Sequence, residues 1–271
     1  MQKSQEVSPQ SVAEGKVAII PCAGMDKALG SVARACAFNI VEKLRPGKAV
    51  LVCIPPLVAG VKPYSEIVKT HSSITIDGCV ERCATKIAVN SGATITGGIM
   101  IPESVEKHKL DLGPEREELA EKLAKEIAMQ SSQEASSQPL PEGKVAIIPC
   151  AGMDKALGSV ARACAFKVVE NLRRDKAVLI CIPPLIAGVK PYSEMVKAYP
   201  SITIDGCVER CATKIAVRNG AKIRGRILIP ESVQKHKLKP KSASDIGPDG
   251  EKLAEKLAEE IAAEIDRLVR K

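Results

Sequence analysis

The sequence predicts an α/β protein of two tandem small doubly wound domains, each a mostly parallel four-stranded sheet flanked by helices. One observation behind this is a near-literal repeat: residues 14–38 match residues 142–166 one for one, and similarity continues to residues 110 and 238. A second is the alternation, inside each copy, of short apolar runs with segments of helical periodicity, which is typical of a parallel sheet covered by helices. The third is length, because 271 residues give each copy the size of one domain with its own core.

Four strands are expected in the first copy, over apolar runs that are too short for helices. These runs are residues 16–20, 49–54, 73–76 and 93–101. Helices are expected where apolar side chains recur every three or four positions. These segments are residues 27–44, 80–89 and 114–129, with a further short helix after Pro63. Pro55 and Pro56 end the second strand because proline cannot donate to a strand ladder. The second copy repeats the pattern.

A segment rich in Ser, Gln and Pro separates the copies at residues 130–141 and has the composition of a flexible linker. We therefore predict a first domain over residues 1–129 and a second over residues 142–271, each ending in an amphipathic helix. The last helix carries an apolar stripe that we expect to pack on its own domain. This stripe consists of Leu253, Leu257, Ile261, Ile265 and Leu268.

The composition fits a globular protein whose core is built from Val, Ile, Leu and Ala, since 45% of residues are hydrophobic but only 2% are aromatic. A net charge of +8 is mild for two domains, and the aromatic stacking platforms of nucleic-acid binders are missing, so we expect no nucleic-acid role. The first 15 residues are polar, and no apolar run approaches the roughly 20 residues of a membrane span. We expect a cytoplasmic protein without membrane contact, and leave protein partners and oligomeric state open.

Each copy carries the same cysteine pattern: one thiol after the first strand, one after the second, and then Asp-Gly-Cys-x-x-x-Cys after the third. The eight cysteines, related by an offset of 128 residues, are Cys22, Cys53, Cys79 and Cys83, and then Cys150, Cys181, Cys207 and Cys211. Ligands of doubly wound sheets bind at the carboxyl ends of the strands, near the point where strand order reverses. If the strand order begins 2-1-3, these ends are neighbours and the four thiols of each copy can meet.

Four converging thiols in a cytosolic protein indicate a metal site rather than a disulfide framework. Zinc suits four thiolates arranged as a tetrahedron, and Cys79 and Cys83 have a spacing found in structural zinc sites. We expect both to lie at the start of one helix, with Gly78 allowing a tight turn into it and Asp77 acting as a helix cap or outer acceptor. Cys36 and its counterpart Cys164 lie on an apolar helix stripe and are expected to be core thiols.

The segment Ile-Asp-Gly-Cys-Val-Glu-Arg-Cys-Ala-Thr-Lys at residues 76–86 and 204–214 follows Pro-Cys-Ala-Gly at residues 21–24 and 149–152. With these motifs the chain resembles the DGC-domain family, which is named for its Asp-Gly-Cys motif and described as proposed zinc-binding proteins. The resemblance covers about residues 15–110 and 143–238. It implies metal binding through these cysteines and supplies no established reaction.

The leading hypothesis is a non-catalytic metal-binding protein with one four-cysteine zinc site per domain, serving structure, metal handling or contact with a partner. An alternative is a thiol redox or sulfur-transfer enzyme in which Cys22 and Cys150 are nucleophiles and the Cys-x-x-x-Cys pairs resolve them, since strand-to-helix positions can lower a thiol pKa. Another alternative is an iron–sulfur protein, because four thiolates can also hold a cluster.

Overall fold

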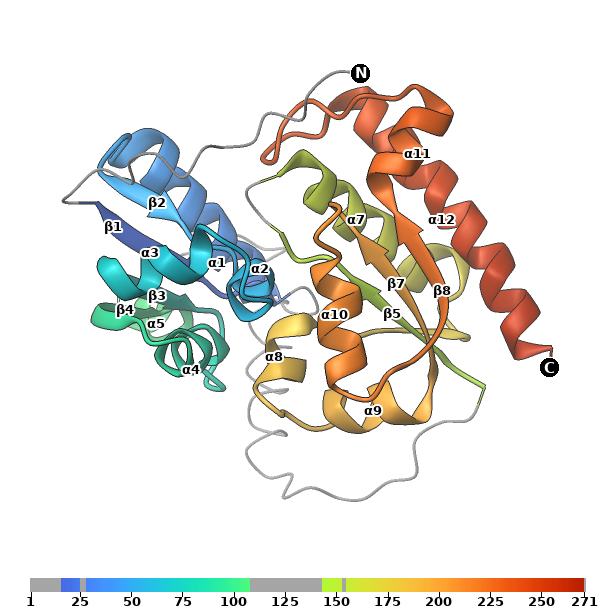
Figure 1. Cartoon of the computed structure of the whole chain (residues 1–271), viewed down its shortest axis with the longest axis horizontal. Helices are drawn as coiled ribbons and strands as arrows, with labels where there is room; N and C mark the ends of the chain where they lie inside the picture. The colour runs from blue at the N-terminus through green and yellow to red at the C-terminus, as the bar shows by residue number, and fades with distance from the viewer. Residues whose placement is uncertain (1–15, 25–27, 108–142, 153–154, 271) are drawn as a thin grey trace.

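The structure, a computed structural model, describes residues 16–24, 28–107, 143–152 and 155–270. It contains two four-stranded sheets, one in each half of the chain, and every pair of neighbouring strands is parallel. The predicted class, two tandem α/β domains, is therefore confirmed (Figure 1). The predicted final helix at residues 114–129 and the predicted linker at residues 130–141 lie outside the described residues.

The sheets have the strand orders β2-β1-β3-β4 and β6-β5-β7-β8, so each begins in the predicted 2-1-3 order. In the first domain the strands are β1 (Val17–Pro21), β2 (Ala49–Leu51), β3 (Ser72–Asp77) and β4 (Thr94–Met100). In the second they are β5 (Val145–Pro149), β6 (Ala177–Leu179), β7 (Pro200–Asp205) and β8 (Lys222–Leu228). Because β1 and β3 pair directly, the chain segments that follow them leave the sheet side by side.

Helices connect the strands in both domains. Those of the first domain are α1 (Ala28–Phe38), its π-helical continuation η1 (Asn39–Leu44), α2 (Ile54–Val58), α3 (Tyr64–Thr70), α4 (Cys83–Asn90) and α5 (Ile101–Lys107). Those of the second are α7 (Ala156–Phe166), η2 (Lys167–Leu172), α8 (Ile182–Ile186), α9 (Tyr192–Ala198), α10 (Cys211–Arg218), α11 (Ile229–His236) and α12 (Gly247–Val269). Among the described residues, none of these helices has the length and apolar character needed to span a membrane.

Four boundaries differ from the sequence prediction. The strand expected over residues 49–54 ends at Leu51, and Pro55 and Pro56, expected to end that strand, lie in the first turn of helix α2. The helix expected over residues 27–44 changes to π-helical geometry at η1, and the strand expected to end at Ile101 ends at Met100, where α5 follows. The helix expected from residue 80 begins only at Cys83, because Arg82 before it adopts a left-handed conformation with φ of 49°. Cys79 therefore lies in a turn ahead of the helix and not in its first turn.

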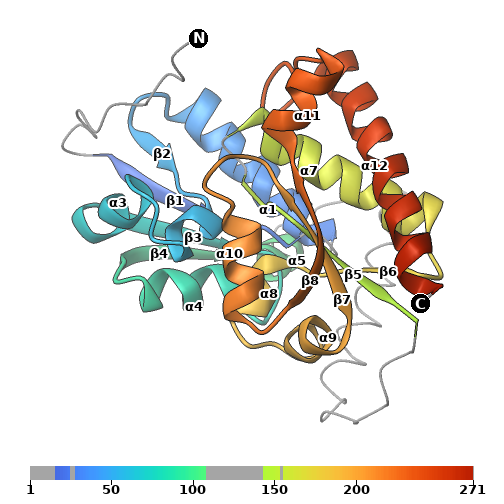
Figure 2. The same ribbon diagram turned by 45° about the vertical axis from the view of Figure 1, so that its right-hand side comes forward.

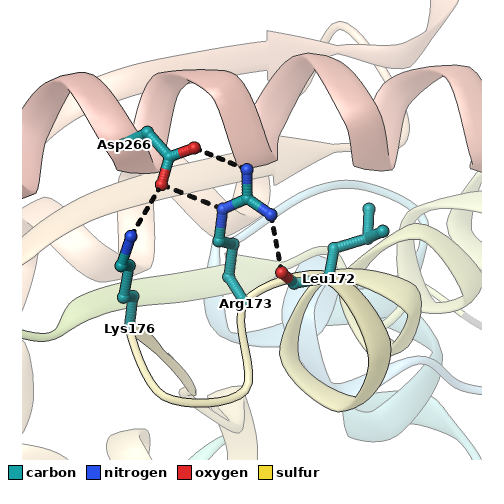
Figure 3. A network of polar contacts seen from close by, with 4 residues as sticks. All are labelled: Leu172, Arg173, Lys176 and Asp266. Carbon is teal, nitrogen blue, oxygen red and sulfur yellow. Dashed lines mark hydrogen bonds and ion pairs between the residues drawn. The ribbon is translucent and has the colours of Figure 1, made fainter.

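The longest helix of the described residues, α12, lies along α7 and η2 in both views of the molecule (Figures 1 and 2). Its apolar stripe faces these elements as predicted, with Leu253, Leu257 and Ile265 at 0% exposure. Near its C-terminal end, Asp266 accepts hydrogen bonds from Arg173 Nε at 3.0 Å and Nη2 at 2.5 Å, and from Lys176 Nζ at 3.1 Å (Figure 3). These contacts fasten α12 to the segment that joins η2 to β6.

We predict that Asp266→Asn lowers the urea midpoint of unfolding at pH 7. The hydrogen bonds from Arg173 and then Lys176 lower the pKa of Asp266 from 3.8 to about 2, so the folded state favours the carboxylate. Its stabilising effect is fully present above the ordinary pKa of 3.8 and is lost as pH falls through the folded value of about 2. The gap between variant and wild type should therefore be smaller at pH 3 than at pH 7. Equal midpoints at pH 7 would contradict this anchoring role, and Glu264→Gln on the same helix is the control.

Candidate metal centre

The carboxyl ends of β1 and β3 hold the first domain's candidate thiols together. The backbone N–H of Cys22 donates to Ile76 O at 2.7 Å, which ties the end of β1 to the Asp-Gly-Cys motif. The Cys22 thiol accepts a hydrogen bond from Gly24 N–H at 3.3 Å and another from the backbone of Gly78. In the second domain Cys150 accepts the same pair from Gly152, at 3.3 Å, and Gly206. Both sulfurs thus lie where backbone N–H groups would stabilise a thiolate.

The aspartate of the motif is a helix cap, which was one of the two roles predicted for Asp77. Asp77 Oδ1 accepts from Ala84 N–H at 2.9 Å, and Oδ2 accepts from Thr85 Oγ1 at 2.5 Å. Asp205 makes the matching bonds to Ala212 and Thr213 at the start of α10. Burial raises the pKa of Asp205, while the hydrogen bonds from Thr213 and Ala212 act in the opposite direction. The carboxylate holds the helix that carries the last cysteine in place.

The glycine of the motif allows a close backbone approach, a role that differs from the turn expected from the sequence. Gly78 has no positive φ. A Cβ added to it would lie 2.8 Å from Gly30 N and 2.9 Å from Leu29 C, which are backbone atoms of α1. Any side chain would push α1 away from the thiols. No local pattern reports this approach, since the partner backbone is about 50 residues earlier in the chain.

The two cysteines of the second Cys-x-x-x-Cys segment are directly coupled. A hydrogen bond between the Cys207 and Cys211 side chains, with further help from the Glu209 backbone and the charge of Lys155, lowers the pKa of Cys207 below its ordinary value. The same hydrogen bond and burial raise the pKa of Cys211. Cys207 is therefore the thiol of this site that ionises first.

The deeper thiols favour the protonated form in the absence of a cation. Burial raises the pKa of Cys22 and Cys150, and it raises that of Cys83 to about 12 with a further contribution from Cys79 and then Cys22. Cys83 interacts electrostatically with both Cys79 and Cys22, so these three thiols of the first domain lie in one neighbourhood. A bound metal cation reverses this preference, since coordination deprotonates a thiol outright.

A small pocket lies at the thiols of the second domain. Cys150, Cys207 and Cys211 line it together with Lys155 and Gly206, and its volume is about 30 Å³. A site needs on the order of 10–15 Å³ on this measure to hold one water molecule. The pocket therefore has room for a single ion or a group of similar size.

The fourth cysteine of each domain lies in a different environment. Cys53 precedes α2 and Cys181 precedes α8, and the two belong to one small buried cluster with Ala23 and Ala151. This cluster joins the two domains. Within the residues the structure describes, no three His, Cys, Asp or Glu side chains are already grouped closely enough to hold a metal ion. The structure thus brings Cys22, Cys79 and Cys83, and their counterparts, to one place each, while the four-thiol sites stay a prediction.

Two arginines near the thiols escaped the sequence prediction. Arg34 Nη1 donates to Gly24 O at 2.8 Å, and Arg162 Nη1 donates to Gly152 O at 2.6 Å. Burial lowers the pKa of Arg34, whereas electrostatic interaction with Cys181 and then Cys22 raises it. Arg162 is only 8% exposed. An arginine on the apolar side of this helix is the sequence feature that could have indicated its role.

The predicted core thiols differ between copies, with Cys164 buried and Cys36 partly exposed.

The fold and these thiols define a class of protein with two parallel α/β domains, each presenting cysteines at the carboxyl ends of its first and third strands. A family model for the DGC domain matches residues 18–127 and 146–267. The chain belongs to the DGC-domain family and contains two tandem copies of its domain. Comparison with curated proteins and with solved structures gave no match.

Proposed function

We propose that this protein binds metal ions, with one thiophilic ion, preferably zinc, in each domain and no catalytic role. The family supports a metal-binding role. The observation that carries the proposal is that Cys150, Cys207 and Cys211 line one pocket of ion size. In the first domain Cys22, Cys79 and Cys83 are the matching cluster.

The residues fit a thiophilic ion in chemistry and in the room available. Cys207 ionises first, and the backbone N–H groups of Gly152 and Gly206 face the sulfur of Cys150. Cys181 and Cys53 supply the fourth thiolate of each site, as the sequence predicts, once the side chains gather around an ion. An ion held by four thiolates contributes folding energy and has no open position for a substrate. The proposed role is therefore structural or metal-handling.

Anaerobic purification followed by elemental analysis tests this function. About two zinc ions per chain are expected, one for each proposed site. The double variant Cys79→Ser/Cys207→Ser should lose most of this zinc. The matched control Cys36→Ser/Cys164→Ser changes two cysteines outside the sites and should keep it. A stably folded, metal-free protein from zinc-replete cells would contradict the proposal.

A second candidate is thiol chemistry, which one observation favours. Cys207 has a lowered pKa and shares a hydrogen bond with Cys211. An attacking thiol and its resolving partner have the same arrangement. For this candidate we propose Cys207 as the nucleophile instead of Cys150, because burial raises the pKa of Cys150. Rapid alkylation of Cys207 at neutral pH in untreated protein would support this candidate. Protection that persists until a chelator is added would support the metal site.

A further inference from the structure

The pocket of the second domain has walls from both domains. On one side are Cys150, Cys207 and Cys211, and on the other are Pro56, Val61 and Tyr64 of the first domain. Pro56 lies on α2, Val61 on the turn that follows it, and Tyr64 at the start of α3. We call these three residues the roof of the second site. The roof is apolar apart from the Tyr64 hydroxyl, whereas the floor carries the thiols and Lys155.

The contact between the domains is reciprocal. Helix α2 packs against α10 and α8 packs against α4, so each domain places its second helix on the helix that follows the other domain's Cys-x-x-x-Cys segment. Val189, the counterpart of Val61, packs against the first domain's core, which includes Cys22 and Cys83. Arg218 of α10 donates to Val58 O at 3.4 Å. In both views α10 faces the first domain (Figures 1 and 2).

Some groups near the thiols of one domain also come from the other domain. Arg34 of the first domain interacts electrostatically with Cys22 of its own domain and with Cys181 of the other. Cys53 and Cys181 come from different domains but share one buried cluster, at 0% and 1% exposure. Side chains from both domains therefore lie near the thiols, although the proposed ligands of each site come from one domain.

We infer that each domain supplies the roof of the other domain's thiol site, and that these roof residues decide what reaches the thiols. This rests on the proposed function, because it concerns access to the same sites. The ligand class is a bare thiophilic cation, since the roof leaves about 30 Å³ beside the second site's thiols. A bulky thiol compound such as glutathione would have to displace the first domain. Tandem duplication thus places in one chain two domains, each of which covers the thiols of the other.

Alkylation of individual cysteines in the full-length protein tests this inference, because trypsin releases the two motif cysteines on different peptides. Cys79 lies on residues 70–82 and Cys207 on residues 198–210. The variant Val61→Ala/Tyr64→Ala truncates two of the three roof residues of the second site, and Val189→Ala/Tyr192→Ala is its mirror image in the second domain. Iodoacetamide labelling is carried out after chelation, so the result does not depend on whether metal was bound.

The first variant should label Cys207 roughly tenfold faster while Cys79 is unchanged, because the altered residues lie in one domain and the exposed thiol in the other. The mirror variant should accelerate Cys79 and leave Cys207 unchanged. If the first variant accelerates Cys79 or leaves Cys207 unaffected, the inference is overturned. If the substitutions only destabilised the domain that carries them, that domain's own cysteine would label faster. That result is the one that overturns the inference. The single changes Val61→Ala and Val189→Ala give the same comparison if the double variants do not fold.

The metal analysis and the alkylation experiment can fail separately. If the protein lacks zinc but substitutions in one domain still accelerate labelling in the other, the inference about the roof residues stands and the proposed metal function does not. If it holds about two zinc ions, the count set by the two proposed sites, and shows no such acceleration, the metal function stands and the inference about the roof residues does not.

Discussion

Replacing Gly158 by alanine is expected to destabilise the protein by about 3 kcal/mol or more, although alanine is the better helix former. Gly158 lies in the first turn of α7, where an added Cβ would overlap the carbonyl oxygen of Gly152. That oxygen belongs to the backbone and also accepts a hydrogen bond from Arg162 Nη1 at 2.6 Å. The loop after Cys150 would have to move, and the thiol pocket would change with it.

Urea unfolding of Gly158→Ala beside wild type measures this effect. Gly98→Ala is a suitable control, because its added Cβ would lie 3.4 Å from Thr75 Oγ1, an ordinary contact. The control should change the free energy of unfolding by less than about 1 kcal/mol, the ordinary cost of a change in an open strand position. A neutral or stabilised Gly158→Ala would show that helix α7 does not approach the Gly152 loop this closely.

Asp205→Ala is the second substitution with a large expected effect, a loss of about 2–4 kcal/mol in the free energy of unfolding. Loss of a helix cap costs about 1 kcal/mol, and leaving buried donors without an acceptor costs about 1–3 kcal/mol more. The donors are the Ala212 N–H and the Thr213 hydroxyl. Asp205 is 2% exposed, so water does not readily replace the carboxylate.

Chemical denaturation of Asp205→Ala and Asp205→Asn separates capping from charge. The asparagine variant keeps one carbonyl acceptor and should recover part of the lost stability. Glu209→Gln is the matched control, since this carboxylate is in the adjoining turn and is 45% exposed beside Lys214. The control should stay within about 0.5 kcal/mol of wild type. If Asp205→Ala were as stable as this control, the aspartate of the motif would not be the cap described here.

Much of the fold follows from the sequence because local patterns determine it. Short apolar runs alternate with helical segments, and only a parallel sheet accommodates that order economically. The placement of Cys22 beside the Asp-Gly-Cys segment follows in turn, since β1 and β3 are neighbours in the sheet. The capping role of Asp77 agrees with its residue type, although Asp77 ends β3 and its carboxylate reaches α4 across the turn at residues 78–82.

Other features depend on contacts that no local pattern encodes. The helix start moved from residue 80 to Cys83 because Arg82 takes a left-handed conformation, which sequence periodicity does not report. The need for Gly78 arises from the backbone of α1, far away in the chain. The roof over the second site could not be foreseen, because a near-literal repeat does not say how its copies meet. The same holds for Cys53 and Cys181, whose positions depend on the contact between domains.

The most direct test of the central claim, that the clustered thiols hold a thiophilic ion, is zinc X-ray absorption spectroscopy on the anaerobically purified protein. We predict a zinc shell made only of sulfur, at about 2.3 Å. A shell dominated by nitrogen or oxygen at about 2.0–2.2 Å, or a folded protein without zinc, would contradict it.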